Sequence, residues 1–260
     1  MIWRGLLVSV RDAAEAAAAL AGGAALIDVK DPTAGSLGAA TAAAVAGVAA
    51  TVRGSVPWTV AAGELRDEIA APGTIERWLG VIAAGAGGSV GGGPAAVKVG
   101  LAGLAQTAWQ PAFRDLMAGL PATTARVVVA YADWERVEAP HPLEIVEQAQ
   151  GSSGVLLNQG SSGVLLMDTA DKSGPALLEA CSEADLEAWV AAARSAGLAV
   201  ALAGRLRLEA IPRLARLRPD VVALRSAVCS NTRLGPVDVA LVRRAAAAVG
   251  LLETTPHGTA

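Results

Sequence analysis

Short apolar runs alternate with alanine- and leucine-rich stretches along almost the whole chain. The apolar runs are typical of strands, and the longer stretches between them are typical of helices. The predicted strands are 5–10, 25–30, 56–62, 95–101, 126–132, 163–169, 199–204 and 221–227. The predicted helices are 12–22, 38–50, 74–86, 106–118, 141–150, 183–196, 207–217 and 237–249. Eight strand–helix units in succession indicate a (β/α)8 barrel.

Residues at the helix ends support these boundaries. Ser182 precedes "EADLEAW", so it suits an N-cap with acidic residues in the first turn. The helix predicted at 12–22 ends on Gly22 and Gly23, as a C-cap should. We therefore expect an α/β protein made of a single-domain TIM barrel over residues 1–250, followed by a flexible C-terminal tail at 251–260.

A doubly wound sheet is the alternative fold. No G-x-G-x-x-G follows the first predicted strand, which argues against a dinucleotide-binding half. The run "GAGGSVGGG" at 85–93 suggests a phosphate loop, but it precedes a strand. In a barrel it would lie on the face away from chemistry, so we interpret it as a flexible connection.

A tandem duplication interrupts the pattern. "GSSGVLLNQ" at 151–159 is followed at once by "GSSGVLLMD" at 160–168. A simple barrel can use only one copy as its sixth strand. We assign the second copy, because it runs directly into "TADK", and interpret the first as a tolerated insertion in the preceding loop.

Composition excludes several classes of protein. Hydrophobic residues make up 53% of the 260 residues, and the net charge is −3, which argues against disorder and against a nucleic-acid partner. Two cysteines and two histidines are too few and too scattered for a zinc site. No apolar run approaches the roughly 20 residues of a membrane helix. We expect a cytoplasmic homo-oligomer that uses no cofactor or metal and binds no membrane.

Lysine is rare in this chain. Lysine and arginine together number 21, and only Lys30, Lys98 and Lys172 are lysines. Each lies in or just after an even-numbered predicted strand, where the chemistry of a barrel takes place. Unlike a guanidinium, a lysine amine can lose its proton when it is buried or lies near another cation, and it can then attack a carbonyl carbon.

Strand alternation predicts which polar groups meet. Asp28 and Lys30 share one face of the second strand. With Lys98, Asp168 and Arg225 from the other even strands, they could meet inside the barrel. A purely structural salt-bridge network is the alternative interpretation, but arginine would serve that purpose equally well. The pattern favours Schiff-base chemistry on a small carbonyl compound, with carboxylates and a second lysine as acids and bases.

Other polar residues on the same rim indicate a phosphorylated substrate. The loops after strands seven and eight commonly bind phosphate in barrels. Here they contain Gly204, which permits close backbone approach, and Arg225 and Ser226, which can donate hydrogen bonds. "PTAGSLG" after Lys30 adds Ser36 before a helix start.

Several motifs together resemble one known family. They are "LIDVKDPTAGSLGA", "PGTI", "VKVGL", "AYAD", "LLMDTADK" and "ALAG", and they extend over nearly the whole chain. The chain resembles the (5-formylfuran-3-yl)methyl phosphate synthases, also called 4-(hydroxymethyl)-2-furancarboxaldehyde-phosphate synthases, which make the furan precursor of methanofuran and methylofuran. The duplication and the loop "CSNTRLG", which lacks a glycine run, depart from that family's pattern.

The resemblance implies a TIM barrel that condenses two molecules of glyceraldehyde 3-phosphate, with loss of one phosphate and two waters. It implies that Lys30 forms the Schiff base and that Lys98 accepts a proton. The sequence itself does not fix which lysine bonds the substrate, and Lys172 is the fallback. Asp28, Asp168 and Lys172 would complete the acid–base set. Two alternatives stay open: a class I aldolase acting on another phosphorylated carbonyl compound, and an inactive barrel with a binding role.

Overall fold

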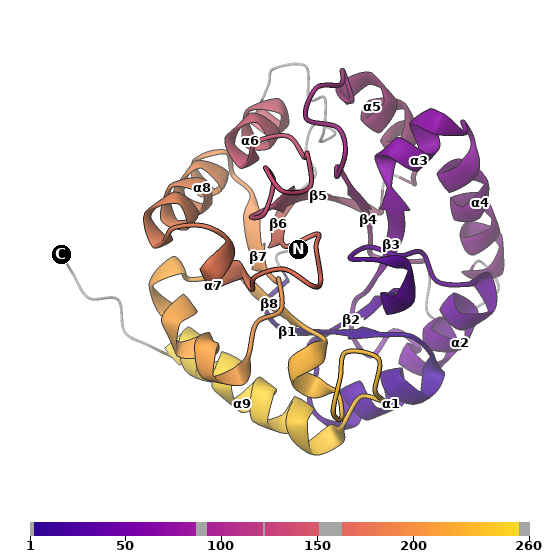
Figure 1. Cartoon of the computed structure of the whole chain (residues 1–260). Coiled ribbons are helices and arrows are strands. Elements are labelled where there is room, and N and C mark those ends of the chain that lie inside the picture. Colours follow the sequence, from indigo (N-terminus) through magenta and orange to yellow (C-terminus); the bar gives the residue numbers. More distant parts are fainter. Residues whose placement is uncertain (1–2, 87–92, 122, 151–162, 255–260) are drawn as a thin grey trace.

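The chain forms a closed barrel of eight parallel strands, seen in a computed structural model that describes residues 3–86, 93–121, 123–150 and 163–254. Each strand pairs with the next, and β8 pairs with β1. The strands are β1 (Gly5–Val10), β2 (Leu26–Val29), β3 (Trp58–Glu64), β4 (Ala96–Gly100), β5 (Ala125–Tyr131), β6 (Val164–Asp168), β7 (Ala199–Leu202) and β8 (Val221–Leu224). Figure 1 shows the helices as a ring around the strands. The predicted single TIM barrel is confirmed.

Helices cover the outside of the barrel, and several of them begin at capping residues that the sequence supplies. The helices are α1 (Ala13–Ala21), α2 (Ala42–Val52), α3 (Leu65–Ala70), α4 (Thr74–Ala86), α5 (Gln110–Ala118), α6 (Pro142–Gln150), α7 (Leu177–Ala180), α8 (Glu183–Ser195) and α9 (Val239–Thr254). The side chains of Asp12, Thr41 and Ser182 accept backbone N–H groups at the starts of α1, α2 and α8, which confirms the Ser182 cap. Within the described residues, no helix has the length and apolar character needed to cross a membrane.

Three short 3₁₀ segments complete the chain: η1 (Pro32–Ala34), η2 (Leu208–Leu217) and η3 (Ser226–Val228). The helix predicted at 207–217 is confirmed as the 3₁₀ helix η2, which contains Pro212, a residue that lacks an N–H and crowds the preceding turn of an α-helix. The short helices α3 and α7 are additions that the sequence pattern does not predict. Helix α9 continues to Thr254, so the first residues of the predicted tail at 251–260 are helical, and 255–260 lie outside the described residues.

The second copy of the duplication forms the sixth strand, as predicted, since β6 is Val164–Asp168. The first copy at 151–159 lies outside the described residues, as does most of the glycine-rich run at 85–93.

Alternation along the strands separates two cores. Outward-facing residues such as Val8, Ile27 and Val200 pack against the helices, whereas a second cluster that includes Leu7, Leu26 and Leu166 fills the barrel. On three strands the inward positions change from apolar to polar toward the carboxyl end. Leu7 is followed by Ser9, Leu26 by Asp28, and Leu166 by Asp168. The apolar plug therefore lies beneath a buried polar layer at the catalytic end.

Candidate active site

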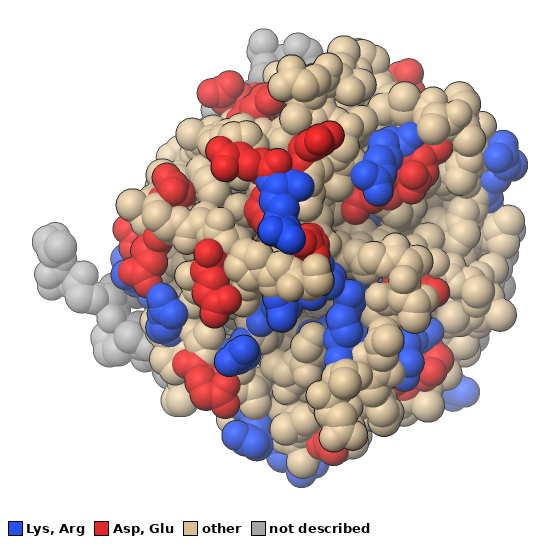
Figure 2. All heavy atoms as spheres, in the orientation of Figure 1, with Lys and Arg blue, Asp and Glu red and all other residues tan. Residues whose placement is uncertain are grey.

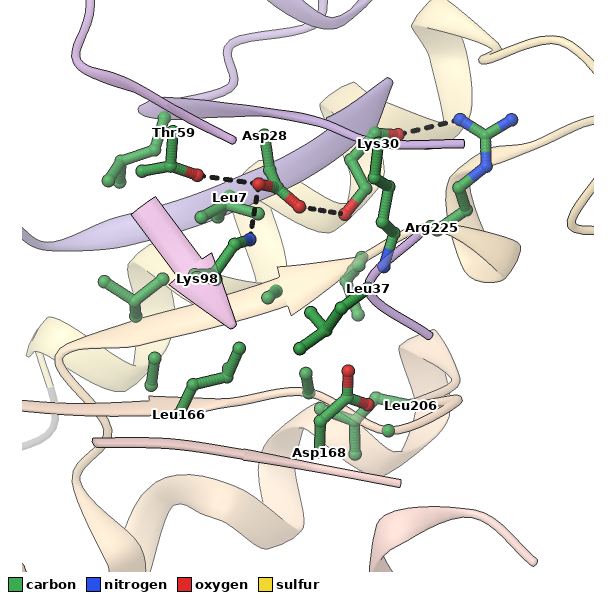
Figure 3. A pocket seen from close by; sticks show the side chains of 18 of the residues that line it. Leu7, Asp28, Lys30, Leu37, Thr59, Lys98, Leu166, Asp168, Leu206 and Arg225 are labelled. Carbon is green, nitrogen blue, oxygen red and sulfur yellow. Dashed lines mark hydrogen bonds and ion pairs between the residues drawn. The ribbon is translucent and has the colours of Figure 1, made fainter. Parts of the chain in front are cut away.

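A pocket opens at the carboxyl ends of the strands (Figure 3). It brings together eight of the nine residues proposed from the sequence: Asp28, Lys30, Lys98, Asp168, Lys172, Gly204, Arg225 and Ser226. The ninth, Ser36, is buried and hydrogen-bonded to Asp168. Among the residues that the structure describes, no group of three or more His, Cys, Asp or Glu side chains is placed to hold a metal ion.

Asp28 and Lys98 form a buried ion pair between β2 and β4. Thr59 Oγ1 donates to Asp28 Oδ1 at 2.7 Å, and Ser9 Oγ donates to Oδ2 at 3.1 Å. Both carboxylate oxygens of Asp28 are therefore held by neighbouring strands. This arrangement fixes an ammonium and a carboxylate side by side, where one can donate a proton and the other can accept one.

Asp168 and Lys172 form a second pair at the end of β6. Lys172 Nζ lies 2.7 Å from Asp168 Oδ1, which also accepts the Thr169 N–H at 2.8 Å. Ser36 Oγ donates to Asp168 Oδ2 at 3.1 Å. Burial would raise the pKa of Asp168, but Lys172 and Lys30 outweigh it, so the net shift of this pKa is downward. The carboxylate form of Asp168 is thus favoured.

Lys30 follows β2 directly and is only 8% exposed. Its Nζ donates to the carbonyl oxygen of Ser36 at 3.2 Å, and no carboxylate of the described residues lies within 4.0 Å of it. Figure 3 shows its side chain extending from β2 toward Asp168. Burial lowers the pKa of Lys30 to about 8, Asp168 and Asp28 oppose the shift, and Lys172 and Lys98 add to it.

Arg225 lies just after β8 and lines the pocket, but its side chain is engaged elsewhere. Its Nη1 and Nη2 donate to the two carboxylate oxygens of Glu15 at 2.6 and 3.2 Å. The other donors reach the carbonyl oxygens of Ser9, Arg233 and Gly235 at 2.9, 2.9 and 3.4 Å. All five N–H groups are used. Arg225 therefore lines the pocket with the lysines and Asp168, as expected, but its donors join β8 to α1 and are not available to a phosphate.

The other residues proposed to bind phosphate differ in whether their polar groups are available to a ligand. Gly204 has φ +92°, and a Cβ there would lie 3.1 Å from the Leu177 Cβ and 3.2 Å from the Thr169 nitrogen. Glycine is therefore needed for the backbone conformation and for close packing on the loop after β6. Ser226 is exposed at the pocket rim. The hydroxyl of Ser36 is engaged with Asp168 and with the Thr169 carbonyl, both at 3.1 Å.

Sequence reasoning missed residues that hold the site in shape. Ser9 and Thr59 orient Asp28, and their inward position on the strands was a usable signal. Asp133, at the end of the "AYAD" motif, is buried, and its two oxygens accept the N–H groups of Ala170 and Asp171 at 2.8 and 2.9 Å. It thereby fixes the loop that carries Lys172. No local pattern identifies Glu15 as the partner of Arg225.

Proteins of similar sequence align with about nine tenths of the chain. The (5-formylfuran-3-yl)methyl phosphate synthase of Archaeoglobus fulgidus is 32% identical over 247 residues, covering 91% of this chain and 95% of the relative. The protein of the same name from Methanocaldococcus jannaschii is 33% identical over 254 residues, covering 92% and 96%. These similarities extend over the whole barrel and are not limited to the pocket.

Solved structures support the fold at lower identity. 3-Hexulose-6-phosphate synthase from Salmonella typhimurium aligns with a TM-score of 0.61 at 14% identity, covering 95% of this chain and 99% of that one. N-(5'-phosphoribosyl)anthranilate isomerase from Pyrococcus furiosus aligns with a TM-score of 0.53 at 13% identity, covering 95% and 99%. The model of one family, described as 4-HFC-P synthase, matches residues 6–246. The chain therefore belongs to the 4-HFC-P synthase family of enzymes.

Proposed function

We propose that the protein condenses two molecules of glyceraldehyde 3-phosphate into 4-(hydroxymethyl)-2-furancarboxaldehyde phosphate through a Schiff base on Lys30. One phosphate and two waters leave, which balances two trioses against one furan phosphate. The name of the relatives, (5-formylfuran-3-yl)methyl phosphate synthase, supports a furan phosphate as the product. The furan would serve methanofuran or methylofuran synthesis.

The environment of Lys30 carries this proposal. Lys98 and Lys172 each lie in an ion pair with a carboxylate, whereas the Lys30 amine contacts only a carbonyl oxygen. At pH 7, a pKa of about 8 leaves about a tenth of the amine neutral, against fewer than about one in a thousand for an ordinary lysine. Of the three lysines, Lys30 is therefore the best nucleophile.

The two ion pairs supply the acids and bases for the later steps. The Lys30 nitrogen adds to the aldehyde carbon and water leaves, which gives an iminium. The iminium acidifies the adjacent C–H, so a neighbouring base can remove that proton and leave a carbon nucleophile for the second aldehyde. Asp28–Lys98 and Asp168–Lys172 each combine an acceptor and a donor of protons within the same pocket. The proton donors of these pairs are needed when the phosphate and hydroxyl groups leave.

Incubation with glyceraldehyde 3-phosphate as the sole substrate tests the proposal. We expect one inorganic phosphate released per furan formed, with the furan followed by its ultraviolet absorbance. A class I aldolase acting on the same triose would give an aldol product without that absorbance and without phosphate release. Absence of both signals at substrate concentrations in the millimolar range would overturn the proposed reaction.

A further inference from the structure

Two arginines at the mouth of the pocket have no assigned role. Arg205 follows Gly204 after β7, and Arg233 lies in the loop between η3 and α9. Both line the pocket that holds Lys30, and both also line an adjoining groove on the outer surface. Figure 2 shows Lys and Arg atoms around the hollow near the middle of this face, over the region where Figure 1 places β8 and β1.

Neither arginine is neutralised by the protein. Among the described residues, no carboxylate lies within 4.0 Å of either guanidinium. Arg233 donates one hydrogen bond, from Nη2 to the carbonyl oxygen of Gly35 at 3.2 Å, and Arg205 makes none within the same part of the chain. By contrast, every N–H group of Arg225 has a hydrogen-bond acceptor. Most N–H donors of Arg205 and Arg233 are thus available to a ligand.

The position of Arg233 is unfavourable without an anion, whereas Arg205 at the rim is exposed to solvent. Burial lowers the pKa of Arg233, and nearby Arg225 and Arg205 lower it further, with Asp168 as the opposing carboxylate. Arg205 has φ +53°, a left-handed conformation that costs a non-glycine residue energy and that is concentrated at functional sites. Like charges and strain collected at one pocket rim indicate that a bound anion completes the arrangement.

We propose that Arg205 and Arg233 together form the clamp for the phosphate monoester of the substrate, in the place that sequence reasoning gave to Arg225. A guanidinium presents paired N–H groups that match phosphate oxygens, which a point charge such as an ammonium does not. Lys30 lies in the same pocket, so one small molecule would present its phosphate to the arginines and its carbonyl carbon to the amine. This inference rests on the proposed function for the identity of that molecule, but the anion site itself does not.

Titration with inorganic phosphate tests the clamp directly. We compare Arg205→Gln, Arg233→Gln and the double variant with Arg4→Gln, which removes the same charge just before β1 at the opposite end of the barrel. Each single substitution is expected to weaken phosphate binding about tenfold and the double variant about a hundredfold, because charge-assisted bonds are lost. Arg4→Gln should bind as the unchanged protein does. Equal phosphate affinity in the double variant and in Arg4→Gln would overturn the clamp.

A second measurement uses borohydride trapping with two aldehydes. The double variant should need about a hundredfold more glyceraldehyde 3-phosphate for half-maximal adduct, while adduct formation with unphosphorylated glyceraldehyde stays unchanged. Loss with both aldehydes would overturn a phosphate-specific role. Arg233→Lys, which keeps the charge and a donor toward Gly35, checks folding and should show an intermediate affinity. These binding data stand even where no furan forms, so failure of the clamp and failure of the proposed reaction are distinguishable.

Discussion

Lys30 differs from the other two lysines in what surrounds its amine. Lys98 and Lys172 are held by carboxylates, whereas Lys30 is buried beside a carbonyl oxygen and between two ion pairs. Desolvation is the largest cause of its lowered pKa, and the two neighbouring lysines add to it. The same feature makes the residue reactive and makes its reactivity depend on pH.

The pH profile of adduct formation follows from this. Below a pKa of about 8, the neutral amine falls about tenfold for each pH unit, so the rate of adduct formation should fall with it and should level off above pH 8. Stopped-flow or quenched trapping between pH 6 and 10 measures this. A midpoint near about 10, the value of an ordinary lysine, would contradict the account.

At the scale of elements, the loop after β6 is held from the end of β5. Both oxygens of Asp133 accept backbone N–H groups immediately before Lys172, and Asp133 is 6% exposed. The loop therefore takes its shape from a neighbouring strand, and the Asp168–Lys172 pair depends on that shape.

Asp133→Asn should therefore lower kcat without a matching change in KM. An amide would place an NH₂ group against one of the two N–H donors, which costs about 1–3 kcal/mol and shifts the loop. A displacement of this kind reduces the rate by about 10- to 100-fold. Steady-state kinetics measures the effects on kcat and KM separately, with Asp115→Asn on the exposed side of α5 as the matched control. A normal kcat in Asp133→Asn would show that the loop keeps its position without this carboxylate.

How well the sequence predicts a contact depends on how far apart the two partners lie along the chain. The strands and the meeting of Asp28 with Lys30 in one pocket follow from local alternation. The partner of Arg225 cannot be predicted in this way, because Glu15 lies 210 residues away in the sequence. The strand pattern is compatible with an Arg225 guanidinium that points into the barrel and with one that points toward the helices. The sequence pattern also predicts a helix at η2, but not that it is a 3₁₀ helix, the form that contains Pro212.

At the scale of the whole molecule, the Glu15–Arg225 pair joins the first and the last strand–helix unit of the barrel. Glu15 on α1 also accepts hydrogen bonds from the Arg11 backbone and side chain, and Arg225 follows the last strand. Strands β1 and β8 pair beside it. Closure of the barrel is thus reinforced by a buried ion pair with all its N–H donors satisfied.

Glu15→Gln should destabilise the protein much more than Glu183→Gln. Breaking a buried pair costs about 3–5 kcal/mol, whereas an exposed pair such as Glu183–Arg213 is screened by solvent and contributes little. Thermal unfolding should show a Tm lower by roughly 2–4 °C for each kcal/mol. Equal Tm values for the two variants would mean that the pair at the barrel seam contributes little to closure.

The central claim is that Lys30 forms the covalent intermediate, and reductive trapping tests it most directly. Borohydride added with glyceraldehyde 3-phosphate should give a single adduct, which peptide mass spectrometry places on the fragment containing Lys30. Lys30→Arg, which keeps the charge but cannot form the iminium, should give no adduct and no furan. An adduct on the fragment containing Lys172 or Lys98, or full activity in Lys30→Arg, would contradict the account.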